Sequence, residues 1–386
     1  MATANNFDSK KSLSNLRKKY KSAGYSNALE FYDDMGDRLR IPSRCVWLND
    51  QLGGGLCYGT FTEIAGYESS GKSLLAKDFA YVTQQLGGVV LWADCERCFD
   101  FIWAKKNGLT LDRIELIKTE AIEVISDWFK DSIKHWRSIL TNNEPILFVC
   151  DSIAALETLE NLEADEVKGK AEMGNRAKGI YRFYRRRNNI LEKYGVVGIM
   201  INQVRKKVGA SMFEAAETMP GGDSTRFYAS NRIMVTRSKQ IKGYLDEKGK
   251  WQDSKEKGKK IGQNVKVDVY KNKTSPPKPA VMTEVYFQDK KYEYVGFNRY
   301  SNVEELLLEA GVITKKGSRY YYGEEMLCNG ETNFNPLMHS KPKLRKKLLD
   351  ALDLNTISKT RARIEAIGKN LYPIKSKKSN EDGDDE

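Results

Sequence analysis

Stretches of consecutive apolar residues alternate, along the middle of the chain, with stretches in which apolar residues recur every three or four positions. The run 145–150 is apolar throughout, which is typical of a strand buried on both faces of a sheet. The stretch 122–140 has apolar residues at helical spacing and predicts an amphipathic helix. The alternation of such strands and helices predicts an α/β fold with a mostly parallel, twisted sheet and helices on both faces.

The same pattern locates the individual elements. We expect strands at 61–65, 88–93, 114–118, 145–150, 196–201, 232–236, 265–271 and 281–287. We expect helices from a glycine-rich turn through Thr83 and at 99–107, 122–140 and 174–194. Residues 240–264 are charged and punctuated by glycines, which indicates an exposed hairpin.

The pattern divides the chain into four parts. Residues 1–40 carry apolar residues at helical spacing among lysines, but they are too few to form a core, so this helical lobe must pack on its own chain or on a neighbour. Residues 41–290 form the α/β core, and residues 291–374 form a small α+β domain. The acidic end, 375–386, is predicted to be disordered.

Composition narrows the choice of partners. The 386 residues carry a net charge of +12, which favours an anionic polymer or surface without choosing between them. No run reaches the roughly 18 apolar residues that span a bilayer, and the lysine-rich N-terminus lacks the apolar segment of a secretory signal. These observations predict a cytoplasmic protein that binds no membrane.

A phosphate-binding pattern follows the strand predicted at 61–65. Residues 66–73 match G-x-x-x-x-G-K-[ST], in which the glycines let backbone N–H groups point at phosphate oxygens. Lys72 is suited to reach the β- and γ-phosphates, and the Ser73 hydroxyl to bind Mg²⁺. The pattern predicts a site for ATP and Mg²⁺ that is lined by Gly66, Tyr67, Glu68, Ser69, Ser70, Gly71, Lys72 and Ser73.

Acidic residues end two further strands. Asp151 directly follows the strand 145–150, where a carboxylate would hold magnesium through water. Asp94 and Glu96 follow the strand 88–93, and either carboxylate could orient and deprotonate an attacking water. The sequence therefore predicts a P-loop enzyme that hydrolyses ATP.

The phosphate loop, with its Glu-Ser-Ser-Gly-Lys sequence, resembles the loop of bacterial RecA recombinases. The resemblance covers roughly residues 41–350 and continues, in order and spacing, through 151–156, 201–203, 217–222, 227–230 and 271–273. It implies a DNA-dependent ATPase that forms a helical filament on single-stranded DNA. It further implies that this filament pairs and exchanges strands with homologous duplex DNA, in recombination, DNA repair and the SOS response to DNA damage.

The resemblance implies roles for the catalytic residues. Glu96 matches the general base of the family, and Gln203 matches the sensor of the γ-phosphate. Lys271 and Lys273 match paired lysines that reach the ATP of the neighbouring protomer. Since lysines at i and i+2 share one face of a strand, the spacing suits two contacts to one triphosphate, although by sequence alone the pair could equally be a solvated edge.

Further positions match the family at the nucleotide base and between subunits. Asp100 and Trp103 match residues that contact the adenine and stack on it, with tryptophan in place of the usual tyrosine. Phe101 stands where the family has proline. Arg226 and Phe227 match the surface between subunits.

Two loops, 157–173 and 205–228, match those that grip the DNA backbone along the filament axis. With the helix after the first loop they supply the expected DNA contacts, which are Met173, Gly174, Arg176, Lys178, Arg185, Arg205, Lys206, Lys207, Phe213, Gly221 and Gly222. Because glycines allow close backbone approach and cations bind phosphate, we expect sequence-tolerant, salt-dependent binding. The first loop departs from the family in being acidic, at Glu157, Glu160, Glu163, Asp165 and Glu166.

The expected partners are single-stranded DNA, homologous double-stranded DNA, further copies of the chain, loading mediators and a single-stranded-DNA-binding protein. A RecA-like helicase motor would share the phosphate loop but would lack the patterns at 221–222 and 271–273. A non-catalytic filament or mediator protein would bind ATP without turnover, and the intact Lys72, Glu96 and Gln203 argue against it. A ring-forming clock or repair paralogue would lack the C-terminal domain.

Overall fold

The computed structural model describes most of the chain from residue 38 onward. The described residues are 18–19, 38–140, 143–163, 169–206, 217–218, 220, 222–247, 251–254, 258–288, 294–352, 356–367 and 371–372. The chain divides into two compact units, Met1–Leu39 and Arg40–Glu386. In the first unit Lys18 and Lys19 are helical, and the other residues of the expected helical lobe up to 37 lie outside the described residues. Residues 38 and 39 are not helical, and strand β1 (Arg40–Ile41) begins directly after them.

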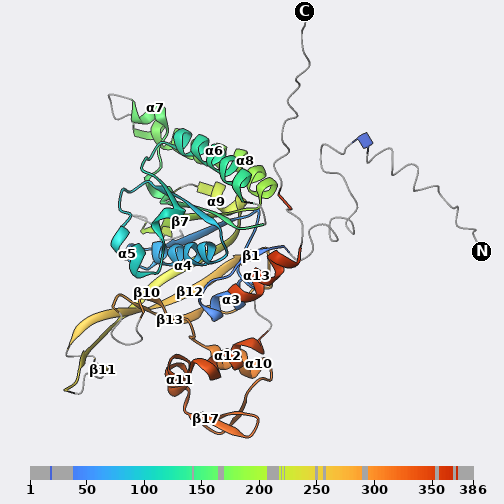
Figure 1. Ribbon diagram of the computed structural model, residues 1–386. Coiled ribbons are helices and arrows are strands. Elements are labelled where there is room, and N and C mark those ends of the chain that lie inside the picture. The colour runs from blue at the N-terminus through green and yellow to red at the C-terminus, as the bar shows by residue number, and fades with distance from the viewer. Residues whose placement is uncertain are drawn as a thin grey trace, which may run out of the picture. The chain divides into compact units, whose positions relative to one another are not determined.

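The second unit is built on a ten-stranded sheet (Figure 1). Its order is β14-β13-β12-β10-β3-β7-β6-β4-β5, and β11 pairs with β10. The strands are β3 (Phe61–Gly66), β4 (Val89–Asp94), β5 (Ile114–Ile117), β6 (Ile146–Asp151), β7 (Val196–Gln203), β10 (Ala229–Leu245), β11 (Trp251–Asp253), β12 (Lys259–Asn272), β13 (Val281–Tyr286) and β14 (Gly296–Phe297). Strands from β10 through β5 pair in parallel, whereas β12, β13 and β14 pair antiparallel. The predicted α/β class with a mostly parallel core is confirmed.

Helices cover both faces of the parallel strands. They are α4 (Lys72–Gln85), α5 (Phe101–Lys106), α6 (Ile122–Ile139), α7 (Leu159–Leu162), α8 (Gly169–Tyr194) and α9 (Gly222–Tyr228). Figure 1 shows α6 and α8 together on one side of the sheet and α4 on the other. Phe129 of α6, Phe148 of β6 and Phe183 of α8 pack ring against ring, and every residue of β6 is buried. This two-sided burial explains the unbroken apolar run in its sequence.

Three elements extend beyond the predicted limits. Strands β10 and β12 continue outward as a paired ribbon, in which Gly243 lies opposite Lys259, so the predicted hairpin is confirmed. Charged side chains are compatible with a strand there because the backbone hydrogen bonds of the ribbon satisfy its polar groups. Helix α8 begins at Gly169, five residues earlier than expected, because residues 170–173 are all good helix formers. The two expected loops are correspondingly shorter, and the second ends in α9.

The C-terminal part has a hydrophobic cluster of its own, formed by residues such as Val303, Leu307, Phe334 and Leu348. Its elements are α10 (Val303–Glu309), β15 (Thr314–Lys316), β16 (Arg319–Tyr322), β17 (Glu325–Asn329), α11 (Phe334–Ser340), α12 (Pro342–Asp350) and α13 (Ile357–Ala366). At the start of the second unit lie β1 (Arg40–Ile41), α3 (Val46–Gln51) and β2 (Leu56–Cys57). None of the helices in the described ranges is long and apolar enough to cross a membrane.

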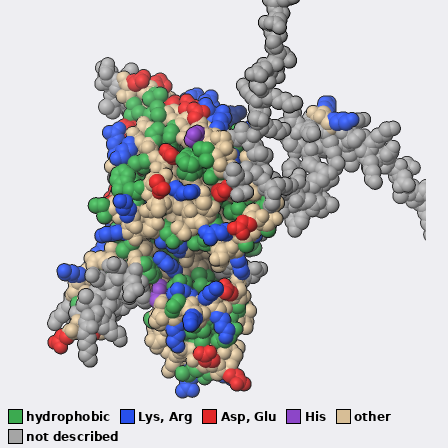
Figure 2. Space-filling view, in the orientation of Figure 1, with side chains coloured by type: hydrophobic (Ala, Val, Ile, Leu, Met, Phe, Trp, Pro, Cys, Tyr) green, Lys and Arg blue, Asp and Glu red, His purple; other side chains and the backbone are tan. Residues whose placement is uncertain are grey.

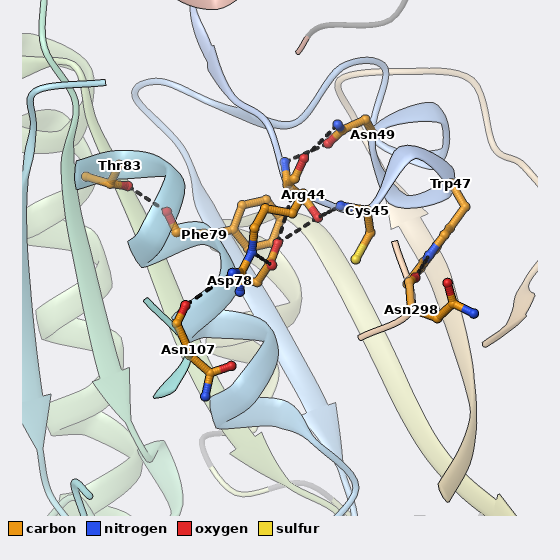
Figure 3. Close-up of polar contacts among 10 residues, drawn as sticks. Arg44, Cys45, Trp47, Asn49, Asp78, Phe79, Thr83, Asn107 and Asn298 are labelled. Carbon is orange, nitrogen blue, oxygen red and sulfur yellow. Dashed lines mark hydrogen bonds and ion pairs between the residues drawn. The ribbon is translucent and has the colours of Figure 1, made fainter. Parts of the chain in front are cut away.

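A buried ion pair fastens the first segment of this unit to α4 (Figure 3). Asp78 of α4 is almost completely buried and accepts hydrogen bonds from the Ser43 hydroxyl at 2.8 Å and from the backbone and Nε of Arg44 at 2.9 and 2.5 Å. Arg44 also donates to the carbonyl of Asn107, at the end of α5, at 3.1 Å. Because α4 directly follows the phosphate loop, this network fixes the helix on which the loop is mounted.

We expect Asp78→Ala to lower the free energy of unfolding by about 3–5 kcal/mol, because it leaves the Arg44 charge buried and uncompensated. Asp112→Ala, at an exposed position, is the matched control and should change it by less than about 0.5 kcal/mol. The double change Arg44→Met with Asp78→Leu should recover much of the loss, since it removes both charges. Urea unfolding measures the free energy of unfolding of all three variants. Equal losses in Asp78→Ala and Asp112→Ala would contradict the role of Asp78 as the buried partner of Arg44.

Candidate functional site

The predicted nucleotide residues meet at one edge of the sheet. Gly66 ends β3 beside Gln203 at the end of β7, and Asp94 ends β4 beside Asp151 at the end of β6. These four strands are neighbours and run parallel, so their carboxyl ends share an edge. In open α/β sheets, ligands bind outside this edge.

The phosphate loop has the backbone shape that a phosphate requires. Gly66, Ser69 and Gly71 all have positive φ angles, of 159°, 56° and 105°. A Cβ atom on Gly66 would lie 2.3 Å from the carbonyl oxygen of Val235, so only glycine fits there. The hydroxyl of Ser70 is buried and has no hydrogen-bond partner in the described part of the chain. A tightly wound loop with an unsatisfied polar group fits a bound phosphate.

Lys72 and Ser73 begin α4 directly after this loop. The Lys72 ammonium donates to the carbonyl of Tyr67 at 2.7 Å, so it lies folded over the loop. Burial lowers its pKa, and the charges of Asp151, Glu96 and Glu68 act in the opposite direction. Burial raises the pKa of Asp151 to about 6, against a hydrogen bond from Ser73. The two residues expected to hold Mg²⁺ therefore lie next to each other, which fits a shared metal.

The two candidates for the general base have different surroundings. Asp94 is buried, and its two oxygens accept hydrogen bonds from the backbone N–H groups of Cys98 and Phe99 at 2.9 and 3.0 Å. It therefore shapes the turn that follows β4. Glu96 is exposed, and one of its oxygens accepts hydrogen bonds from the Ser152 hydroxyl and from Gln203 Nε2, the latter at 2.8 Å. Of the two carboxylates, Glu96 is the one that faces the edge of the sheet.

A chain of hydrogen bonds leads from Glu96 into the second loop. Gln203 contacts Glu96 through its side chain, and its backbone N–H donates to Asn202 Oδ1 at 2.9 Å. The amide nitrogen of buried Asn202 donates in turn to the carbonyl of Pro220 at 2.9 Å and to Glu63 at 2.8 Å. Asn202 thus connects the backbone of Gln203 to the second loop.

Lys271 and Lys273 lie at the end of β12, near α9. The ammonium of Lys271 donates to the backbone carbonyls of Arg226 and Ala229, the second at 2.6 Å. Burial and the positive charges of Lys273 and Arg232 lower the pKa of Lys271 to about 8. Lys273 is exposed, and its backbone N–H donates to the carbonyl of Ser230. Their role towards a neighbouring protomer stays a prediction.

The expected adenine contacts lie on α5. Asp100 accepts a hydrogen bond from the backbone of Trp103 at 2.8 Å and caps the helix. Trp103 is partly exposed beside Phe101 and Ile102, which are both exposed. Of the predicted subunit contacts, Arg226 and Phe227 are exposed on α9, Phe227 to 72%.

Three of the expected DNA contacts on α8 share one exposed face. Gly174, Lys178 and Arg185 follow helical spacing along it. Arg176 is instead partly buried and donates to the carbonyls of Ile153 and Ala154 at 3.1 and 2.5 Å, so it also closes the turn after β6.

Among the expected contacts of the second loop, Arg205 is exposed. Residues Lys207, Phe213 and Gly221 lie outside the described residues, as do the side chains of Met173 and Lys206. The face shown in Figure 2 carries lysines and arginines in several groups, and its acidic side chains include a group around α7.

Sequence reasoning gave no role to three residues that the structure adds to the site. Ser152 contacts Glu96, Asn202 joins Gln203 to the second loop, and Gln263 Nε2 donates to the carbonyl of Ser69 in the phosphate loop at 2.9 Å. Ser152 directly follows Asp151, and Asn202 directly precedes Gln203, so their positions beside predicted site residues could have identified them. Gln263 lies in the hairpin insertion, and no local pattern marks it.

Comparison with known proteins identifies the family. The family model described as the RecA N-terminal domain matches residues 14–290. The chain is 31% identical to protein RecA of Aquifex pyrophilus over 312 residues, which covers 80% of each chain. It is 30% identical to protein RecA of Aquifex aeolicus, over 81% of each chain, and 28% identical to protein RecA of Oleidesulfovibrio alaskensis, over 89% of this chain and 90% of the relative. The chain therefore belongs to the RecA family, whose members act in DNA recombination and repair.

Proposed function

We propose that this protein is an ATP-dependent recombinase that polymerises on single-stranded DNA and pairs it with homologous duplex. The observation that carries the proposal is the contact between Glu96 and Gln203 at the carboxyl edge of the sheet. It joins the group suited to activate water to the strand that leads into the second loop. A nucleotide held at this edge would therefore influence the loop and be influenced by it.

The residues divide the work on ATP between them. The wound loop 66–71 would receive the phosphates through its backbone, and Lys72 would leave the Tyr67 carbonyl to bind them. Ser73 and Asp151 would hold Mg²⁺, which when bound neutralises charge on the phosphates. Glu96 would accept the proton of the attacking water, and Ser152 and Gln203 hold its carboxylate in position.

Coupling to DNA would run through Gln203 and Asn202. If Gln203 turned from Glu96 towards a γ-phosphate, the hydrogen bond from its backbone N–H would shift the side chain of Asn202. Asn202 donates to the carbonyl of Pro220, so the second loop would shift with it. The exposed cations Arg205, Lys178 and Arg185 would then bind the DNA backbone. Hydrolysis of ATP would reverse these movements and release the second loop.

Assembly would need a rearrangement at Lys271. Its ammonium is engaged with backbone carbonyls at the end of α9, next to the exposed Arg226 and Phe227. A neighbouring protomer that packs against α9 would release Lys271 from these carbonyls. Lys271 and Lys273 could then both reach the ATP of that neighbour. Filament growth, loading by mediators, displacement of a single-stranded-DNA-binding protein, a role in the SOS response and a cytoplasmic location belong to the same proposal.

We expect ATP hydrolysis to be stimulated strongly by single-stranded DNA. Glu96→Ala should lower the stimulated rate by about 100-fold or more, because it removes the general base. Lys72→Ala should abolish hydrolysis and weaken ATP binding, whereas Asp94→Asn should cost stability more than it costs rate, since Asp94 caps a turn. Phosphate release with and without DNA measures the rates. Turnover that ignores DNA would favour the helicase-type motor, and ATP binding without turnover would favour the non-catalytic filament protein.

The lysine pair gives a separate test of assembly. We expect Lys271→Ala with Lys273→Ala to reduce DNA-stimulated hydrolysis by about 100-fold, as is usual when groups that stabilise transition-state charge are removed. Lys266→Ala, at an exposed position of the same strand, is the matched control and should have little effect. Electron microscopy should show nucleotide-dependent filaments for the control and not for the double variant. Normal filaments and turnover in the double variant would contradict a role between protomers.

A further inference from the structure

A cavity of about 530 Å³ lies where the antiparallel side of the main sheet meets the C-terminal part. Its walls come from β12, β13, the segment 298–302, α10, residues 331–332 and the start of α11. In the part of the chain that the structure describes, no residue proposed to act on ATP or to bind DNA lines it. The described residues of the lining include three glutamates, Glu284, Glu304 and Glu331, and among them there is no lysine, arginine or histidine.

Glu304 is the most deeply buried of these glutamates. It is only 7% exposed, and its carboxylate accepts a hydrogen bond from its own backbone N–H. Among the described residues no side chain donates to it and no cation pairs with it. Burial, followed by the charges of Glu331 and Glu305, raises its pKa to about 7, although Lys315 acts in the opposite direction. A buried carboxylate is normally paired with a cation, so this one lacks the partner that its surroundings call for.

A second acceptor in the same cavity also lacks a donor. The side-chain oxygen of Asn335 is buried and has no hydrogen-bond partner within the described ranges. By contrast, Glu284 is satisfied, because Tyr286 and Asn298 donate to the same one of its oxygens, the latter at 3.0 Å. The unmet groups of the cavity are therefore acceptors, and they call for a ligand with several donors and a positive charge.

The shape of the lining limits the ligand further. The described residues contain no group of histidine, cysteine or acidic side chains suited to hold a metal ion, so the cavity glutamates do not converge on one point. Met282, which is 51% exposed, and Pro336 add apolar surface between the polar groups. A charged head and a methylene chain suit this combination.

We propose that this cavity binds an alkylammonium group, with the ammonium held by Glu304 and Asn335 and the methylene chain lying along Met282 and Pro336. The group can come from a free polyamine or from a lysine side chain of a partner protein. The protein carries a net charge of +12, so its overall field repels such a ligand. Binding would thus depend on the local acceptors of the cavity and not on the general charge of the surface.

Calorimetric titration of the full-length protein with spermidine, without DNA or nucleotide, tests the proposal. We expect one saturable site whose affinity falls at least about 10-fold in Glu304→Gln, because a hydrogen bond to a charged group is lost. Glu309→Gln removes a charge from an exposed position of the same helix and should leave the affinity unchanged. No saturable binding, equal losses in the two variants, or displacement of spermidine by equimolar Mg²⁺ would each overturn the proposal.

Two further measurements keep the test decisive. Glu304→Gln should fold, since it replaces an unpaired carboxylate by a neutral side chain of the same shape, and circular dichroism checks this. If it does not fold, Glu331→Gln at the exposed rim takes its place, and an affinity equal to that of the Glu309→Gln variant would overturn the proposal.

Titration with Nα-acetyl-lysine amide separates the two sources of the alkylammonium group, because tighter binding of this probe than of spermidine points to a protein side chain. Since neither DNA nor ATP is present, failure here would leave the recombinase proposal untouched.

Discussion

Parallel pairing of β3, β7, β6 and β4 is the constraint on which the proposed chemistry depends. In the order named, these strands end at Gly66, Gln203, Asp151 and Asp94, which all lie at the proposed site. A slip of one residue in any pairing would turn the side chains of that strand to the opposite face. The apolar packing of the sheet between α4 on one face and α6 and α8 on the other fixes the register, so the buried core also determines the geometry of the site.

A buried carboxylate links this parallel edge to the antiparallel half of the sheet. Glu63 of β3 is fully buried and pairs with Arg232 of β10 at 2.5 Å, while Tyr270 of β12 and Asn202 of β7 also donate to it. Hydrogen bonds and an opposite charge offset the cost of burying a carboxylate, so the partners of Glu63 favour one arrangement of these four strands. Tyr270 is next to Lys271, and Asn202 is next to Gln203. The cluster therefore connects the strands that carry the proposed sensor, the second loop and the proposed inter-subunit lysines.

Several residues that local sequence patterns group together have different functions in the fold. Asp94 and Glu96 are two residues apart, yet they have different partners. Backbone N–H groups donate to both oxygens of Asp94, whereas Glu96 faces the edge of the sheet. Arg187 belongs to a run of arginines on α8, but it is buried against Ser126 and Asp127 of α6, whereas Arg185 is exposed. Burial separates such neighbours, and burial depends on which elements pack above them.

The α/β class, the phosphate loop and the positions of most core strands can be predicted from the chain alone, because each depends on residues that are contiguous or regularly spaced. The sequence also marked Gln203, Lys271 and Lys273 as candidates through their resemblance to a known family. Three features depend on the folded chain: which carboxylate faces the site, how Asn202 connects to Pro220, and the hydrogen bond from Gln263 to Ser69, which lies 194 positions away. The cavity around Glu304 and Asn335 has the same origin. Contacts between distant segments follow from the packing of the whole chain, and no local pattern of residues encodes them.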